Sequence, residues 1–317
     1  MKTSKLFLST LAIVVAASLT VTSCRKKEKT AEVEPERETE TANDNALAEN
    51  TNNDIIAIGS QLSENSGTLT TYRSSGPESL FLAAAGCATV TSALTGSVIT
   101  SYTVDFGTTG CVGADSRTRK GKLMYDFTQS TNNAKWYRNP GFKMIITSNG
   151  YSVDGNAVTI NNKVVSNTTP TNIPTGTNPG TNLTWSIVAD ISIVKANSQT
   201  VAWTCNRTKE LVNTSDVNCY KGQSLPIDWT KAKIKINGTA NGTNAKGENF
   251  TAVATDLLRD FTCTPSATQP QRHPFISGTV SYTPGNRATR VIDYGNGSCD
   301  FNVTITVNGQ TFSTTLP

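Results

Sequence analysis

The chain has 317 residues, only 16% of them charged, and a formal net charge of +4 at pH 7. That charge falls by two if Lys2 and Lys5 leave with a leader, so the chain lacks the basic surplus of a nucleic-acid-binding protein. Thr, Asn, Ser and Gly fill the polar positions, and this composition favours half-exposed strands joined by tight turns.

Residues 1–23 have the layout of a secretory signal peptide. A short basic lead is followed by an apolar run at residues 6–21, which is short for a membrane-spanning helix of roughly 20 residues. The sequence VTSC at residues 21–24 then resembles the lipobox of bacterial lipoproteins, whose cysteine receives a diacylglycerol before the chain is cut just ahead of it. This predicts Cys24 as the lipid attachment residue, with a conventional signal or an uncleaved anchor as alternatives.

The count of seven cysteines supports the lipid interpretation. An odd cysteine in an exported chain needs an explanation, and lipidation of Cys24 leaves six cysteines that an oxidising compartment could pair completely. One acyl chain holds a protein weakly on a membrane, whereas two or three hold it durably. We therefore expect the membrane to be a permanent partner through the N-terminal lipid.

Residues 24–43 are rich in Glu and Lys and contain no aromatic residue, which predicts a disordered, charged stalk. Arg25 stands where the enterobacterial signal for retention in the inner membrane would have Asp. This favours a lipid anchor in the outer membrane, at the periplasmic face or the cell surface.

Residues 44–66 predict a short helix. Asp44 is a plausible N-terminal cap and Gly67 a plausible stop. The apolar residues that fall on one helical face are Leu47, Ile55, Ile58 and Leu62.

Residues 67–317 predict one antiparallel β domain. Apolar and polar residues alternate in LTWSIVADISIVK, residues 183–195, which indicates a strand with one buried and one wet face. The pair Asn308-Gly309 between two alternating runs predicts a tight hairpin. No βαβ spacing occurs, so the expected fold class is all-β: an antiparallel meander or sandwich with long strands and hairpins, one short N-terminal helix and an internal repeat.

Further turn signals punctuate this domain. The prolines and glycines of residues 166–183 predict a long exposed loop rather than a domain boundary, because the two copies of the repeat flank it. Tight turns are also predicted at Asn149-Gly150, Asp154-Gly155, Asn237-Gly238 and Asn241-Gly242.

The internal repeat has the pattern [VI]-D-[FY]-G-x-x-x-C, at residues 104–111 and 292–299. Each copy follows another cysteine, and two copies of one unit suggest a β body with the repeats at its ends. Six cysteines leave many pairings open, of which the repeat favours Cys87–Cys111 and Cys263–Cys299. Cys205–Cys219 would then close a loop across the middle. The absence of any CxxC or CxH spacing argues against a metal site.

These segments together carry a resemblance. The lipobox, the charged stalk and the blocks DNALAENTNNDIIAI, DFGTTGCVGADSRTRKGKLMYDF and IDYGNGSCDFNVTITVNG are similar to an uncharacterised group of secreted lipoproteins common in Bacteroidota. The likeness covers essentially the whole chain, and the D-[FY]-G-x-x-x-C elements are its most specific part. It implies an envelope location and carries no known activity, so it transfers no catalytic residue.

Catalytic machinery is hard to find in the sequence. His273, the single histidine, lies beside a proline without a G-x-S-x-G serine, and is expected to face solvent. No glycine-rich phosphate loop occurs, so no cofactor is expected. Asp105 and Asp293 of the repeat are the carboxylates that remain for a hydrolase, although each is expected to bond the backbone of its own glycine turn. Calcium at DYGNGSCD is an alternative use whose spacing is not that of an EF-hand.

Aromatic residues offer a binding hypothesis. Trp136 and Tyr137 are adjacent, so a strand would point them to opposite faces, and one of them could stack on a sugar ring. Packing in the core or at an edge is the competing interpretation.

The sequence therefore predicts a lipid-anchored protein of the cell envelope that is not an enzyme. Its role would be structural or adhesive, or the binding of a glycan or an envelope protein by a sheet face. The alternative is a carbohydrate-active hydrolase that uses paired carboxylates.

Overall fold

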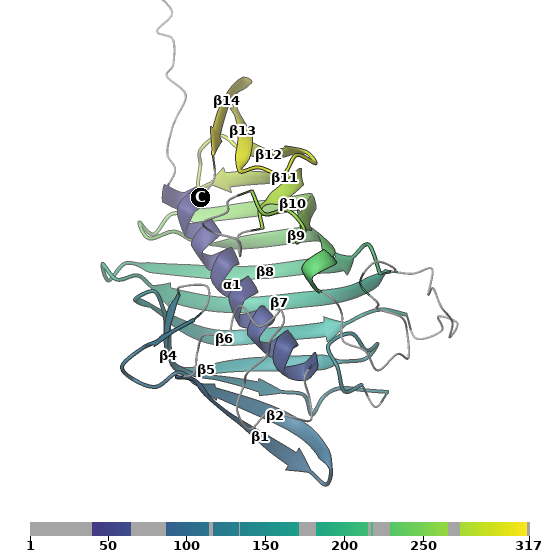
Figure 1. The fold of residues 1–317 in the computed structure, drawn as a ribbon. Coiled ribbons are helices and arrows are strands. Elements are labelled where there is room, and N and C mark those ends of the chain that lie inside the picture. The colour runs from purple at the N-terminus through teal and green to yellow at the C-terminus, as the bar shows by residue number, and fades with distance from the viewer. Residues whose placement is uncertain are drawn as a thin grey trace, which may run out of the picture. The chain divides into compact units, whose positions relative to one another are not determined.

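The computed structural model describes residues 40–64, 87–113, 117–132, 134–170, 182–214, 217, 229–265 and 273–315. The chain divides into two units, Met1–Glu34 and Pro35–Pro317, and all described residues belong to the second. The expected signal peptide, Cys24 and most of the expected stalk therefore lie outside the described residues. What is described is an antiparallel β-sheet with one α-helix lying on one of its faces (Figure 1).

Two helices and fourteen strands make up this part of the chain. The helices are α1 (Glu40–Glu64) and the short 3-10 helix η2 (Trp229–Lys231). The strands are β1 (Thr89–Thr95), β2 (Val98–Asp105), β3 (Cys111–Val112), β4 (Thr118–Asp126), β5 (Lys143–Val153), β6 (Asn156–Asn167), β7 (Leu183–Val194), β8 (Thr200–Leu211), β9 (Lys233–Thr243), β10 (Asn249–Asp260), β11 (Phe275–Pro284), β12 (Arg290–Asn296), β13 (Asn302–Val307) and β14 (Gln310–Thr315).

The strands follow one another across a single sheet in the order of the chain. Only β3 lies off this path, where it pairs with β4. All the pairs are antiparallel, as expected for strands joined by hairpins. The all-β prediction is confirmed, and the described strands form a meander instead of a sandwich.

The long central strands separate apolar from polar residues by alternation. In β7, one face carries Trp185, Ile187, Ala189, Ile191 and Ile193, each at most 3% exposed. The other face carries half-buried or exposed residues, among them Val188 and Val194. This confirms the alternation expected at residues 183–195, and the two faces of the sheet thus differ in what they cover.

Two of the predicted tight turns are present. Asn308-Gly309 joins β13 to β14, and Asp154-Gly155 joins β5 to β6. All four residues have positive φ, between 50° and 79°, as a two-residue hairpin of this kind requires.

The other three predicted turns are wrong, because these pairs lie inside strands. Asn149-Gly150 is in β5, and both Asn237-Gly238 and Asn241-Gly242 are in β9. A Cβ at Gly238 or Gly242 would collide with a backbone carbonyl of the neighbouring β8. These glycines allow the neighbouring backbone to approach closely at irregular points of the sheet. In the sequence, an Asn-Gly pair with this role looks the same as one that forms a turn.

The expected long loop at residues 166–183 is shorter at both ends. β6 continues to Asn167 and β7 begins at Leu183, while residues 171–181 lie outside the described residues.

Helix α1 begins at Glu40, four residues before the expected start. Residues 40–43 therefore belong to the helix and not to the stalk. Asp44 is not a cap: it lies inside the helix with its side chain 2% exposed, and it pairs with Lys195 at 2.8 Å. The helix ends at Glu64, and Gly67, the expected stop, lies outside the described residues.

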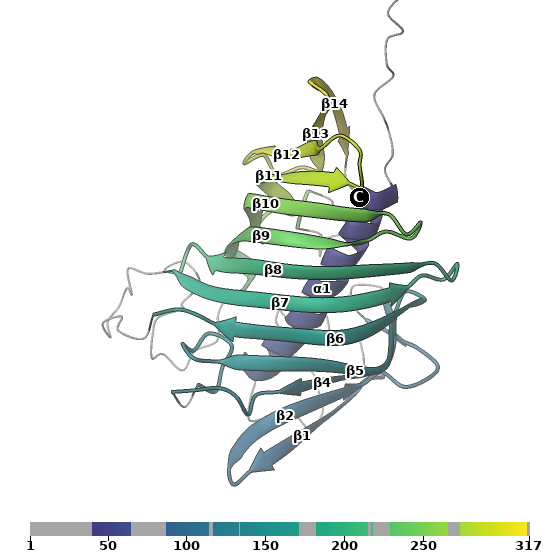
Figure 2. The same cartoon turned by 180° about the vertical axis from the view of Figure 1, so that it is seen from behind.

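The helix crosses the strands on the face that carries the apolar residues. Figures 1 and 2 show it running from the level of β11 to that of β5, in front of the strands in one view and behind them in the other. Ile55, Ile58 and Leu62 are fully buried. A Cβ at Gly59 would lie 2.5 Å from Met144 Sδ and from the Tyr125 ring, so glycine lets the helix approach the sheet closely.

Polar contacts hold α1 to the sheet along its whole length. Acids of the helix meet bases of the strands and loops, and helix amides meet polar groups of the sheet. The pairs are Thr41 with Asn244, Asp44 with Lys195 and the Ala245 amide, Asn45 with Trp203, Glu49 with Arg207, Asn52 with Lys163, Asp54 with Arg119, and Glu64 with Arg138. The buried helix is thus fixed in place by specific partners, because unpaired polar groups would be costly there.

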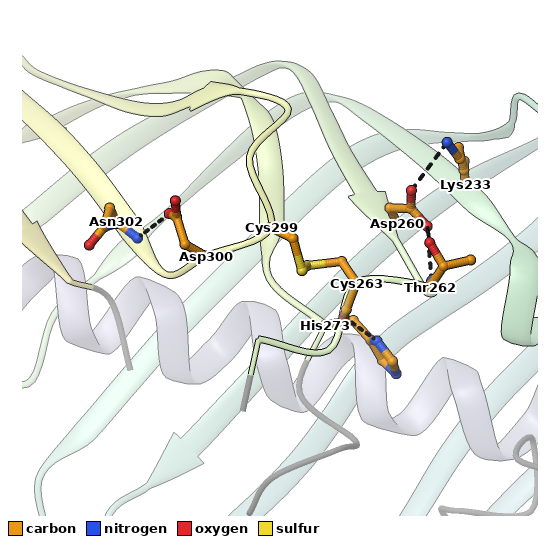
Figure 3. Close-up of a disulfide and its surroundings, with 8 residues drawn as sticks. All are labelled: Lys233, Asp260, Thr262, Cys263, His273, Cys299, Asp300 and Asn302. Atoms are coloured by element: carbon orange, nitrogen blue, oxygen red, sulfur yellow. Dashed lines mark hydrogen bonds and ion pairs between the residues drawn. A yellow bond between two sulfur atoms is a disulfide. The ribbon is translucent and has the colours of Figure 1, made fainter. Parts of the chain in front are cut away.

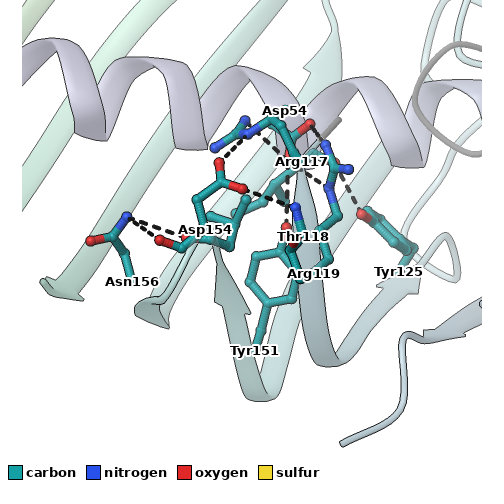
Figure 4. Close-up of polar contacts among 10 residues, drawn as sticks. Asp54, Arg117, Thr118, Arg119, Tyr125, Tyr151, Asp154 and Asn156 are labelled. Carbon is teal, nitrogen blue, oxygen red and sulfur yellow. Dashed lines mark hydrogen bonds and ion pairs between the residues drawn. The ribbon is translucent and has the colours of Figure 1, made fainter. Parts of the chain in front are cut away.

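The most connected of these contacts centres on Asp54 (Figure 4). Its carboxylate accepts two hydrogen bonds from Arg119, and both side chains are at most 2% exposed. Tyr151 donates to the same carboxylate at 3.4 Å, and Arg117 lies 3.5 Å away. Arg117 also reaches Asp154 at 2.9 Å, at the surface, where that side chain is 45% exposed.

We expect Asp54→Asn to lower the free energy of unfolding by about 3–5 kcal/mol, because it removes the buried carboxylate that is paired with the Arg119 guanidinium. Asp154→Asn is the matched control and should change it by about 1 kcal/mol or less, since an exposed ion pair contributes little. Asn also tolerates the positive φ of 51° at this position. Denaturant titrations of the two variants check this, and equal effects would contradict it.

Candidate functional site

Two of the three predicted disulfides are formed. Cys87–Cys111 and Cys263–Cys299 have Cα–Cα distances of 5.5 and 5.4 Å. The prediction of a Cys205–Cys219 bond is corrected: Cys205 carries a free thiol, buried on the helix side of β8. Cys219 lies outside the described residues. Alternation along β8 points Cys205 into the packed face between sheet and helix, which a sequence count of cysteines cannot reveal.

The two copies of the repeat lie at opposite ends of the sheet, as predicted. Asp105 ends β2 and accepts a hydrogen bond from the Gly107 amide at 2.9 Å, and Asp293 of β12 accepts one from the Gly295 amide at 2.8 Å. The bond that Asp105 accepts from Lys122, together with the Gly107 bond, lowers the pKa of Asp105. Each aspartate therefore hydrogen-bonds to the backbone of the glycine turn that follows it, as the sequence predicted.

Asp105 and Asp293 cannot form the carboxylate pair of a hydrolase. Eight strands separate β2 from β12 in the sheet, which corresponds to roughly 40 Å at the usual strand spacing. A glycosidase pair needs its carboxyl groups within about 10 Å. This particular pairing is therefore wrong.

His273 is half-buried instead of facing solvent (Figure 3). Its Nδ1 lies 2.9 Å from the carbonyl oxygen of Cys263, beside the Cys263–Cys299 disulfide, so Nδ1 is the donor. Its ring packs 5.0 Å from the Phe261 ring. Burial lowers the pKa of His273 below its usual value, so the ring braces the disulfide as a neutral group.

Trp136 and Tyr137 lie in turns between β4 and β5, not on a strand. Tyr137 is fully buried and stacks on Trp185 with ring centres 4.7 Å apart, so it cannot stack on a ligand as predicted. Trp136 is half-buried under the Arg138 guanidinium at 4.5 Å, and its ligand role stays a prediction.

The sequence did not point to the site that does stand out, on the helix side of β8 and β10. Lys209 of β8 is half-buried, and its Nζ lies 5.5 Å from the Tyr137 ring centre, 5.7 Å from that of Trp185 and 5.2 Å from that of Trp229. Three aromatic rings thus surround one ammonium group, a geometry that favours a cation.

Arg259 of β10 is the second cation of this site. It lies opposite Ile234, which lies opposite Leu211 of β8, so all three point to the helix side. Its guanidinium lies 4.5 Å over the Phe275 ring, and Phe275 packs edge-on against Tyr294. The Nε of Arg259 is buried without a hydrogen-bond partner.

Charge is not balanced in this cation–aromatic site, which we define as Lys209, Arg259, Trp229, Phe275 and Tyr294. The nearby Glu49 of α1 is already paired, at 2.8 Å, with Arg207 of β8. Among the contacts of the described residues, neither Lys209 nor Arg259 has an acidic partner or a hydrogen bond. Within the described residues, two positive charges therefore share one partly buried region without an acid in contact, although the charge of Glu49 acts on Arg259.

The titration of the site reflects this crowding. Burial, with a smaller contribution from the Arg259 charge, lowers the pKa of Lys209 to about 8. Burial also lowers the pKa of Arg259 and raises that of Tyr294 to about 12. Lys209 is consequently cationic at neutral pH but close to losing its proton.

The site could have been suspected from one signal. The odd-numbered positions of β8 point to the buried face, and Lys209 is one of them. The buried apolar residues at these positions are Val201, Trp203, Cys205 and Leu211. A lysine at an inward position of an alternating strand is unusual. Arg259 gives no such signal, because irregularities in the pairing of β10 interrupt the alternation of inward and outward residues before this position.

No family model matches the chain, and no curated protein and no solved structure was found to be similar to it. Within the described part of the chain, no helix has the length and apolarity needed to cross a membrane. Over the same residues, no cluster of three or more His, Cys, Asp or Glu side chains could hold a metal ion.

We expect Tyr137→Ala to lower the free energy of unfolding by about 3–5 kcal/mol, because it empties a fully buried ring position. Trp136→Ala, at the neighbouring half-buried residue, should cause less than half of that loss. Denaturant unfolding of both variants measures the two losses. A larger loss of unfolding free energy for Trp136→Ala would contradict the assignment of Tyr137 as the buried ring.

Proposed function

We propose that this chain is a lipid-anchored binding protein of the bacterial outer membrane, which holds an acidic glycan without transforming it. The lipobox-like VTSC sequence at residues 21–24 supports the anchor, and the bond would be made at Cys24. The cation–aromatic site supports the ligand class. The observation that carries the proposal is the pair of cations, Lys209 and Arg259, without an anionic partner among the described contacts.

An anion would satisfy this pair. A carboxylate or sulfate that reached both side chains would accept charge-assisted hydrogen bonds from them. Arg is well suited to such groups because its planar guanidinium offers several donors in fixed directions.

The rings around the cations favour a sugar as the carrier of the anion. Trp229 and Phe275 are both half-buried, so part of each side chain reaches solvent. Aromatic rings contact ligands with their faces, while polar groups at the edges of a site supply hydrogen bonds. An acidic sugar residue combines a ring for stacking with a charge for Lys209 and Arg259.

Binding can be measured with dextran sulfate and polygalacturonate, using neutral dextran as the uncharged probe. Lys209→Met and Arg259→Met should each weaken binding of the acidic polymers by about tenfold or more, because each variant loses a charge-assisted hydrogen bond. Lys235→Met, which removes a lysine paired with Glu210, is the control and should bind as the unaltered chain does. Equal binding by all four proteins would refute the site.

The same binding should depend on pH. Lys209 is cationic below its pKa of about 8 and neutral above it, so affinity for the acidic polymer should fall as pH rises from 7 to 9. In Lys209→Met this part of the pH dependence should disappear, while Arg259 stays charged throughout. A flat profile in the unaltered chain would exclude Lys209 as a ligand.

The anchor has its own test. Cells fed a radiolabelled or alkyne-tagged fatty acid should label the unaltered protein, and Cys24→Ser should abolish the label and release the protein from the membrane fraction. A labelled Cys24→Ser protein would contradict the assignment.

A further inference from the structure

Another buried base, Lys163, lies between α1 and the sheet. Lys163 of β6 is fully buried, and its Nζ hydrogen-bonds to Oδ1 of Asn52 on α1, which is 1% exposed. The two residues are 111 positions apart in the sequence. This is the one hydrogen bond that the Lys163 side chain makes among the described contacts, and it is to a neutral group.

The surroundings of Lys163 favour an uncharged amine. Burial lowers its pKa to about 7, although the charges of Cys205 and Glu49 act in the opposite direction. Burial also raises the pKa of the Cys205 thiol to about 12. The thiol is therefore neutral and supplies no counter-charge to Lys163. A substantial fraction of Lys163 therefore carries a free electron pair on Nζ at neutral pH, as a nucleophilic lysine requires.

The amide group of Asn52 is held on one side only. Its Oδ1 accepts the bond from Lys163, whereas its Nδ2 is buried and has no hydrogen-bond partner. Departure of that nitrogen would break no hydrogen bond of the described structure. It would also remove a buried donor that is otherwise unsatisfied.

Glu49 provides a proton carrier beside this pair. It precedes Asn52 by three residues on α1, so both side chains lie on one face of the helix. Its Oε2 accepts a hydrogen bond from Arg207 Nη2, and its charge raises the pKa of Lys163, so the carboxylate is within electrostatic range of the amine. Its position is fixed by the Arg207 pair, in which both side chains are at most 17% exposed.

We propose that Lys163 and Asn52 react with each other to form an intramolecular amide bond that joins α1 covalently to β6. Nζ of Lys163 attacks Cγ of Asn52, forming the C–N bond, and Glu49 takes the proton that Nζ loses. Glu49 then returns that proton to Nδ2, the Cγ–Nδ2 bond breaks, and ammonia leaves. The amine and the primary amide become one secondary amide plus ammonia, and no oxidant or cofactor is required.

The neighbouring Lys195–Asp44 contact shows why the reaction is specific to one lysine. Lys195 also reaches a side chain of α1, at 2.8 Å, but it is 24% exposed and its partner is a carboxylate. A carboxylate resists attack by an amine, so the Lys195–Asp44 contact is an ion pair and not a reacting pair. Lys195 is the matched control for the experiment.

The experiment is peptide mass spectrometry of the full-length protein after reduction and trypsin digestion. If the bond forms, residues 38–73 and 144–195 appear as one branched species, uncleaved at Lys163 and lighter than the sum of its two parts by one ammonia, about 17 Da. Separate, unmodified peptides from folded protein, with cleavage after Lys163, would overturn the proposal. This measurement needs no variant and so does not depend on any variant folding.

Variants then test the roles of the three residues. Asn52→Ala and Lys163→Met should abolish the branched species, and Lys195→Arg should keep it in full. Glu49→Gln also removes the acid paired with the buried Arg207, so its folding is checked by circular dichroism, and the folded protein should yield at least tenfold less of the branched species at early times after refolding. An undiminished yield in Glu49→Gln would overturn the proton-transfer role of Glu49, and loss of the species in Lys195→Arg would overturn the assignment to Lys163.

Discussion

A sheet of one layer has two faces, and its stability depends on covering one of them. Here α1 lies across the strands on the apolar face, yet the helix itself is rich in Asn, Thr, Asp and Glu. It is held by the buried side chains of Ile55, Ile58 and Leu62 and by acids and amides that each find a partner on the sheet side. The docking of this polar helix is the constraint on which the rest of the described structure depends, because a buried polar group without its partner is destabilising.

The same constraint explains where unusual chemistry accumulates. Along most of α1 a base of the sheet meets an acid of the helix, and the charges cancel. At Lys163 the helix offers an amide instead, and at Lys209 and Arg259 it offers nothing among the described contacts. Basic side chains on the covered face thus differ in what α1 supplies to them: an acid, an amide, or no contact among the described residues.

Sequence patterns predicted those parts of the fold that local physics determines. Alternation located β7, Asn308-Gly309 located the last hairpin, and the repeat located two disulfides at opposite ends of the sheet. The errors arose where a residue serves a long-range contact. Gly238 resembles a turn residue but accommodates a neighbouring strand, and Tyr137 resembles a surface ring but packs on Trp185. The cation–aromatic site joins β8, β10, β11, β12 and η2, and no local pattern records such a meeting.

The direction of α1 has a mechanical consequence. A tether on the N-terminal side of the helix would transmit tension first to Glu40 and the turn around Asp44. Because the helix lies across the strands, its contacts would break one after another under such a pull. The contact of Thr41 would break first and that of Asp54 later. A covalent stop at Asn52 would end that peeling partway along the helix and pass the load to β6, in the middle of the sheet, where many strands share it.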